Sequence, residues 1–281
     1  MASGFFSNDP LPAEARIACR VEYDGTAYSG WQSQPDEHVS TVQDRVESAF
    51  ATICQQPVRV HCAGRTDTGV HGHCQVIHFD PGVSRSCKAW VVGANANLPP
   101  DIRIHWAVPV PAEFHARFSA LSRRYCYVIA NTPVRPALLL HRAAWARRPL
   151  DAAAMHSAAQ ALPGERDFSA FRAASCQSVS PMRNVEAVTV RRLGDLVVID
   201  IAANAFLHHM VRNIAGALML VGSGQRPPDW IADLLAAGDR TKSADTAAAE
   251  GLYLTGVTYP GHYDLPATPA VPALLWALRG D

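Results

Sequence analysis

Residues 58–79 read VRVHCAGRTDTGVHGHCQVIHF, a stretch with a candidate strand on either side of a polar turn. Apolar residues alternate through 58–62, and a second apolar run covers 75–79, which is typical of strands in a half-buried sheet. The turn between them, residues 65–71, combines glycine with polar side chains. Such a turn can present backbone and side chains to a cleft, so we expect the chemistry of the chain to lie here.

Strand and helix patterns alternate on both sides of this stretch. We expect strands over 17–23 and 102–108, where apolar residues occupy every second position. A helix is expected over 42–53, because apolar residues recur there at helical spacing and Ser40 with Gln43 forms a capping-box pattern. The first part of the chain is therefore predicted to mix strands with helix.

Beyond a proline-marked boundary at 109–116, a second set of strands and helices is expected. Its elements are strands over 124–129 and 252–258, a hairpin of 185–190 with 196–201 around Gly194-Asp195, and helices from Asp151, over 207–221 and over 230–235. Strands, helices and hairpins mixed in this way favour an α+β or mixed α/β fold in two halves.

These patterns divide the chain into four parts. They are an N-terminal extension (1–15), an N-terminal α/β domain that carries the polar turn (16–113), a C-terminal α/β domain (114–266) and a proline-bearing tail (267–281). We expect the tail to be a loose or surface-bound segment rather than a domain.

The composition limits the class of protein. The 281 residues are 48% hydrophobic, which supplies a sizeable core, and the 25 basic and 25 acidic side chains cancel, so a polyanion could be met only by a local patch. Seven cysteines without a CxxC pair indicate reduced thiols. No signal peptide or run of 18 apolar residues is present in the sequence, so we expect a cytoplasmic protein that has no membrane partner.

Asp67 and Arg65 are the pair in the turn that could carry chemistry. A carboxylate in a desolvated pocket needs a compensating charge, and a nearby guanidinium keeps it ionised as a nucleophile or base. The alternative is structural: Asp67 caps the turn through its own backbone, and Arg65 is a solvated surface residue. The pattern by itself leaves both interpretations open.

Residues 64–71, GRTDTGVH, resemble the signature of the tRNA pseudouridine synthase A family, whose active-site aspartate lies in a GRTDxGVH motif. Other segments resemble those of the family in the same order: 23–25 (YDG), 30–32 (GWQ), 95–99 (NANLP), 114–119 (FHARFS), 123–127 (RRYCY), 167–172 (DFSAFR), 204–213 (NAFLHHMVRN) and 250–253 (EGLY). The similarity runs from about residue 16 to about residue 266. It departs from the family at Cys126, where relatives often have a basic residue, and at both termini.

The resemblance implies an isomerase that converts uridine to pseudouridine at positions 38, 39 and 40 in the anticodon stem-loop of tRNA, without metal or organic cofactor. It implies a two-domain pseudouridine synthase fold, with mixed, largely antiparallel sheets flanked by helices around a central cleft, and a homodimer. Attack at C6, attack at C1′ and a glycal route all need one carboxylate and a flipped-out base, so the chemical route stays open. A catalytically inactive tRNA-binding or folding protein of the same fold is the alternative function.

The resemblance also assigns site residues. Asp67 is the catalytic carboxylate, Arg65 a phosphate or stacking contact beside it, Tyr125 a ring that can stack on uracil, and Arg212 the ion-pair partner of Asp67. Arg212 could instead be a solvated residue on the flank of its helix. Arginines that could line an RNA groove are Arg117, Arg123, Arg124 and Arg172, with Arg183 and a separate group at 142–148; some of these are expected to be merely solvated.

One rival site is a zinc centre. Cys62, His71, His73, Cys74 and His78 are ligand types that zinc accepts. Their spacing matches no standard zinc module, and neighbouring strand residues such as His73 and Cys74 point to opposite faces. We therefore expect no metal.

Overall fold

The computed structural model describes residues 7–36, 38–267 and 271–272, and it divides into two compact units. The first unit extends through Leu121 and takes in the segment that starts at Leu254. The second spans Ser122–Tyr253 and includes Val271. The start of the predicted N-terminal extension and most of the predicted tail lie outside the described residues.

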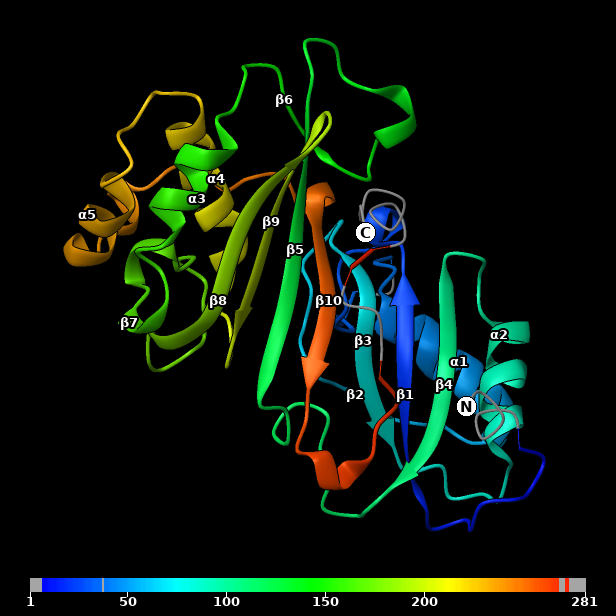
Figure 1. The fold of residues 1–281 in the computed structure, drawn as a ribbon. Helices are drawn as coiled ribbons and strands as arrows, with labels where there is room; N and C mark the ends of the chain where they lie inside the picture. The colour runs from blue at the N-terminus through cyan, green and yellow to red at the C-terminus, as the bar shows by residue number, and fades with distance from the viewer. Residues whose placement is uncertain (1–6, 37, 268–270, 273–281) are drawn as a thin grey trace. The chain divides into compact units, whose positions relative to one another are not determined.

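The first unit contains an antiparallel sheet (Figure 1). Strand β1 (Arg16–Tyr23) pairs with β3 (His71–Phe79) on one side and β4 (Ile102–Val110) on the other, and β2 (His61–Cys62) pairs with β3. Strand β10 (Leu252–Thr258), which belongs to this unit from Leu254 onward, follows β3 in the strand order. The predicted strand over 58–62 is much shorter than expected, because only its last two residues pair with β3.

Both faces of this sheet are covered. Helix α1 (Val42–Cys54) packs on one face, where its Phe50 stacks on Phe79 at 4.3 Å between ring centroids; the π-helix η3 (Ala89–Gly93) and α2 (Ala94–Asn97) complete this core. On the opposite face, Trp106 and Phe114 form a second cluster with residues from the 257–265 segment. Strand β1 is therefore buried on both faces, with Ile17, Cys19 and Val21 in the first core and Ala18 in the second cluster.

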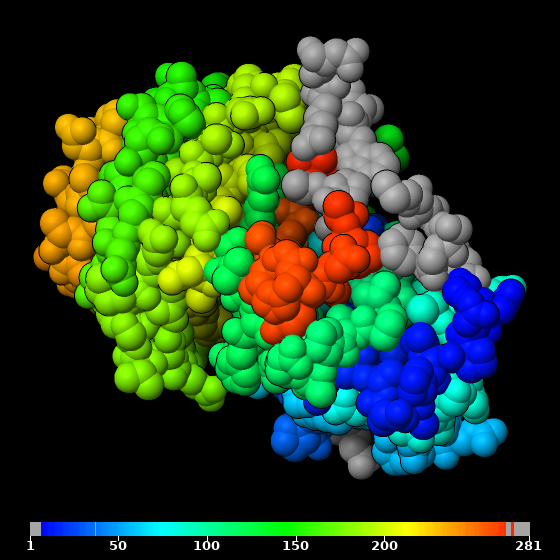
Figure 2. All heavy atoms as spheres, turned by 60° about the horizontal axis from the view of Figure 1, so that its bottom comes forward, coloured from blue at the N-terminus to red at the C-terminus, as the bar shows by residue number. Residues whose placement is uncertain are grey.

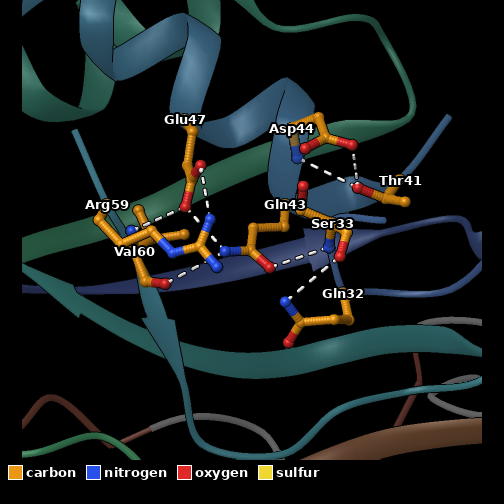
Figure 3. Close-up of polar contacts among 8 residues, drawn as sticks. All are labelled: Gln32, Ser33, Thr41, Gln43, Asp44, Glu47, Arg59 and Val60. Atoms are coloured by element: carbon orange, nitrogen blue, oxygen red, sulfur yellow. Dashed lines mark hydrogen bonds and ion pairs between the residues drawn. The ribbon is translucent and has the colours of Figure 1, made fainter. Parts of the chain in front are cut away.

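Helix α1 begins at Val42, as the sequence predicts, but its capping residue differs from the predicted one. Thr41, not Ser40, is the N-cap, and its side chain accepts a hydrogen bond from the backbone N–H of Asp44 (Figure 3). Two further helix side chains tie α1 to the rest of the unit. Gln43 accepts from the N–H of Ser33, and Glu47 accepts from the N–H of Val60, immediately before β2 (Figure 3). Helix α1 therefore sets the position from which β2 and the polar turn start.

The second unit has its own antiparallel strands, in the order β5 (Ser122–Asn131), β9 (Leu196–Ala203), β8 (Met182–Leu193) and β7 (Gly164–Asp167). The short β6 (Ala144–Ala146) runs parallel to β5. Helix α3 (Ala152–Ala159) packs on β8, α4 (Met210–Gly222) contacts β5 and α3, and α5 (Trp230–Ala237) lies against α3 and α4 (Figure 1).

The expected fold class is confirmed: antiparallel strands predominate, with helices on them. The hairpin around Gly194 is present. Gly194 has a φ of +58°, a left-handed conformation that glycine adopts readily. Helix α4 starts at Met210 rather than near 207, because His209 has a φ of +61° and cannot be part of the helix. No helix in the described ranges is long and apolar enough to cross a membrane.

Candidate active site

The polar turn joins β2 to β3 in the first unit, and Gln75 of β3 fixes its start. The Gln75 side chain is fully buried; its Oε1 accepts from the N–H of Gly64 at 3.3 Å, and its Nε2 donates to the Gly64 carbonyl at 2.6 Å. The backbone N–H of Ala63 donates to the Val76 carbonyl at 2.8 Å. The chain therefore leaves β2 along a fixed path, although Gly64 has no side chain to hold it.

Thr66 anchors the middle of the turn. Its hydroxyl lies 2.8 Å from the Tyr23 hydroxyl, and its carbonyl accepts from the N–H of Trp31 at 3.0 Å. Thr66 is buried, whereas Asp67 is half-buried and Arg65 is exposed. The buried threonine thus holds the backbone from inside while its two neighbours remain accessible.

The backbone of Gly30 packs closely against the turn at Asp67. Gly30 has a φ of +89°, and a Cβ added there would lie 2.6 Å from the Thr66 carbonyl oxygen and 3.2 Å from the carbonyl carbon of Asp67. The N–H of Val70 donates to the Asp67 carbonyl at 3.1 Å, closing a tight turn that includes Gly69 at a φ of +78°. Only glycine at position 30 leaves room for this turn.

Two guanidinium groups act on the same thiol beside the turn. Desolvation raises the pKa of Cys62 to about 12, and the charges of Arg65 and Arg117 oppose that rise. Both arginines must therefore lie close enough to Cys62 to influence it. Two positive charges therefore lie near the start of the turn, in a chain whose net charge is zero.

The other five predicted site residues lie in the second unit, and β5 carries three of them. The ring of Tyr125 is buried and meets Phe206 edge-to-face at 5.1 Å between centroids. Arg123 is buried and donates to the Asn204 carbonyl at 3.1 Å. Arg124, on the other face of the strand, forms a bidentate ion pair with Asp200, which raises the pKa of Arg124. The guanidinium groups of both arginines therefore already have partners in the protein.

Arg212 lies in the first turn of α4, where its Nε donates to the Ala247 carbonyl at 2.8 Å. The next residue, Asn213, is fully buried, donates to the Phe171 carbonyl and accepts from Thr246 and Arg240. This network sets the direction of the first helical turn. The sequence did not predict this role of Asn213. The only sign of it there is that Asn213 ends the segment 204–213, which begins with another asparagine.

Arg172 also has a structural task. Its NH2 group donates to the carbonyls of Cys176 at 2.9 Å and Ser178 at 2.6 Å, so it closes the loop that follows. Arg183 reaches the same loop through the Ser178 hydroxyl. Arg117 lies in the first unit and is exposed, and its charge acts on Cys62 at the start of the polar turn.

The residues of the rival zinc interpretation have separate partners. The Nδ1 of His71 accepts from the N–H of Gly25, while His78 stacks on His61 at 5.0 Å between centroids. His73 lies 3.9 Å from Glu22. These three histidines of β3 therefore point to different surroundings.

Comparison with known proteins identifies the family. A family model described as tRNA pseudouridine synthase matches residues 19–119 and 158–260. The tRNA pseudouridine synthase A of Klebsiella pneumoniae (strain 342) is 55% identical over 260 residues, which are 92% of this chain and 96% of that protein. The protein of the same name from Citrobacter koseri is 54% identical over 264 residues, and that of Escherichia coli O1:K1 / APEC is 53% identical over 269 residues. These alignments cover 94% and 96% of this chain, and 97% and 99% of the two relatives.

A chain from the crystal structure of a Cbf5-Nop10-Gar1 complex is similar over 85% of this chain and 48% of its own length, with a TM-score of 0.33 and 12% identity. That likeness is too slight to bear on the fold. The sequence matches cover both units and include the polar turn. The chain belongs to the tRNA pseudouridine synthase family. The expected class of enzyme, an isomerase that forms pseudouridine, is confirmed at the level of the family, and nothing in the comparisons favours the inactive alternative.

Proposed function

We propose that this chain isomerises uridine to pseudouridine at positions 38, 39 and 40 in the anticodon stem-loop of tRNA, with Asp67 as the catalytic carboxylate. The observation that supports the proposal is the construction of the turn. Buried Gln75 and Thr66 hold the backbone on both sides of Arg65, and Gly30 packs under Asp67, while Asp67 itself is only half-buried. A carboxylate held in this way can meet a substrate without first reorganising.

The chemistry requires one reactive carboxylate and a detached base that does not escape. The N1–C1′ bond breaks, the uracil turns and a C5–C1′ bond forms, while C5 loses a proton and N1 gains one. Asp67 attacks C1′ or C6, or assists removal of the C2′ proton, in this exchange. We propose that Tyr125 stacks on the uracil and that Arg212 pairs with Asp67. The edge-to-face contact with Phe206 and the hydrogen bond to Ala247 restrict the conformations of these two side chains.

The substrate RNA must also be held by positive charge. Arg65 and Arg117 are exposed near the turn and are the proposed phosphate contacts of the first unit. Arg123, Arg124 and Arg172 hold protein groups with their guanidiniums, so we propose that they shape the RNA-binding surface and contact phosphates only through remaining N–H groups. We further propose a homodimer located in the cytoplasm, as the family resemblance implies.

Incubation of the protein with unmodified tRNA transcripts, followed by mapping of pseudouridine, tests the function. The wild type is expected to modify positions 38 to 40. Asp67→Asn is expected to form no pseudouridine and to bind tRNA with an affinity near that of the wild type, since it removes the reacting oxygen anion but few RNA contacts. Modification at other positions, or full activity of Asp67→Asn, would contradict the proposal.

A further inference from the structure

Phe118 is an exposed aromatic residue in the loop that connects β4 to β5. Its side chain is 75% exposed, and the guanidinium of Arg117 lies over its ring at 5.5 Å from the centroid. An isolated apolar residue on a surface needs no explanation. Here, however, the exposed ring is paired with a cation, and aromatic rings and guanidinium planes are the two groups on which proteins stack nucleic-acid bases.

The ring of Phe118 packs on a cluster of three histidine rings, in which His61 and His115 are also neighbours at 5.3 Å between centroids. His61 and His78 stack at 5.0 Å, His78 meets His115 at 4.6 Å, and His115 meets Phe118 at 4.4 Å between centroids. Burial and the neighbouring His115 lower the pKa of His78 to about 3, and desolvation also lowers the pKa of His115. At neutral pH these two rings are therefore uncharged, and the positive charge beside Phe118 is that of Arg117.

Hydrogen bonds within the protein hold the loop of residues 115–118 in place without a ligand. The Nδ1 of His115 accepts from the backbone N–H groups of Arg117 at 3.1 Å and Phe118 at 3.3 Å. The N–H of Ala116 donates to the Nδ1 of His78, and the Ala116 carbonyl accepts from the hydroxyl of Tyr259. Figure 2 shows the teal-green segment of this loop at the surface beside the orange segment that contains Tyr259. An exposed ring on an ordered backbone loses little entropy on binding.

His61 of the histidine cluster lies close in the sequence to the turn that carries Asp67. His61 precedes Cys62, the residue on which both Arg65 and Arg117 act electrostatically. Asp67 follows Cys62 by five residues, which limits the distance between their Cα atoms to about 18 Å. Phe118 and Asp67 both lie in the first unit.

We propose that Phe118, supported by Arg117, is a stacking platform for an unpaired base of the substrate RNA near the target uridine. The inference rests on the proposed function, because it assigns the platform to the same substrate. Stacking on an ordered ring would hold the RNA strand in place while the target nucleotide is flipped out. Phe118 is therefore a positioning residue and not a catalytic one.

The test measures the affinity of unmodified tRNA transcript for Phe118→Ala, Phe118→Leu and Phe118→Tyr, each in an Asp67→Asn background so that no turnover occurs. Phe118→Ala and Phe118→Leu are expected to weaken binding roughly 5- to 150-fold, the range found when a stacking ring is removed. Phe118→Tyr is expected to bind like the parent. Leu121→Ala, at another exposed apolar residue of the same unit, is the matched control and is expected to bind normally.

Transcripts with an abasic nucleotide at successive positions of the loop identify the stacked base. At the contacted position, Phe118→Ala should cause no further loss, because the partner of the ring is already missing. Normal binding by Phe118→Ala, normal binding by Phe118→Leu, or an undiminished effect of Phe118→Ala on every abasic transcript would each overturn the proposal. A wild type that binds tRNA but forms no pseudouridine would refute the proposed function instead, and the affinity series would still decide whether Phe118 stacks.

Discussion

Gln75 and Gly64 are joined by two hydrogen bonds, in which the side-chain amide of Gln75 pairs with both the N–H and the carbonyl of Gly64. At the point where β2 ends, the Gln75 side chain thus makes the two hydrogen bonds that a neighbouring strand would otherwise make with the backbone of Gly64. Since Gln75 is fully buried, neither partner can exchange the other for water. The approach of the chain to Asp67 is thereby determined by a residue that lies outside the turn.

Replacement of Gln75 by leucine is expected to lower both stability and turnover. The two backbone groups of Gly64 lose their partners, at a cost of about 1–3 kcal/mol in the free energy of unfolding, and Asp67 loses its fixed position. Urea unfolding and single-turnover pseudouridine formation measure the two effects. Asn95→Leu is the matched control, since the Asn95 amide pairs in the same way with the N–H and the carbonyl of Ile104 in β4, which does not pair with β3: a similar loss of stability with normal turnover is expected there. Equal turnover in both variants would show that the Gln75 clamp does not position Asp67.

Gly30→Ala is expected to disturb the turn more than its backbone angle alone predicts. The left-handed φ of Gly30 costs alanine about 1 kcal/mol, and the contact of the new methyl group with Thr66 adds about 1–3 kcal/mol. Gly164 has a similar φ of +94° with no atom within 4 Å of an added Cβ, so Gly164→Ala should show the first cost only. Thermal unfolding and turnover of the two variants separate strain from steric contact, and identical behaviour would exclude a steric role for position 30.

The salt dependence of tRNA affinity should distinguish Arg117 from Arg124. Arg117→Gln is expected to reduce the slope of log affinity against log salt concentration by about 0.7–0.9, the value for one phosphate contact. Arg124→Gln should change the slope little, because Asp200 already compensates the charge of Arg124. Filter binding over a range of salt concentrations measures both slopes. A larger change for Arg124→Gln than for Arg117→Gln would mean that the pair with Asp200 opens on RNA binding.

His78 is expected to make the protein less stable as the pH falls below about 6.5. Its folded-state pKa of about 3 lies below the ordinary value of 6.5, so between these values the unfolded chain binds a proton that the folded chain excludes. The groups that act on His78 are His115, His61, Arg16 and Asp80, of which only Asp80 favours the charged imidazole. Stability should therefore decrease by up to about 1.4 kcal/mol per pH unit on account of this residue.

His78→Asn tests that expectation, because the asparagine Oδ1 can accept from the N–H of Ala116 in place of Nδ1 and does not titrate. The smaller side chain lowers stability at every pH by a constant amount. Urea unfolding between pH 4.5 and pH 7 should consequently show a shallower pH dependence in the variant than in the wild type. Parallel curves would exclude His78 as the source.

Local patterns in the sequence determined much of the fold, because alternation and helical spacing report which side of an element is buried. The strand patterns at 17–23, 185–190 and 196–201 and the helix starting after Asp151 all correspond to observed elements. Errors occurred where a boundary depends on one backbone angle or one hydrogen bond. Helix α4 begins late because of the left-handed His209, and α1 is capped by Thr41 instead of Ser40.

The identity of Asp67 as the candidate carboxylate also came from the sequence, since eight contiguous residues of a motif are visible without a structure. What holds that carboxylate required the tertiary structure. Gln75 reaches back across the β2–β3 pair, and Gly30 approaches the turn from more than thirty residues away. The sequence likewise could not show that Arg124 is paired with Asp200 or that Phe118 packs on a cluster of three histidines. Such contacts depend on the approach of residues distant in the chain, which no local periodicity encodes.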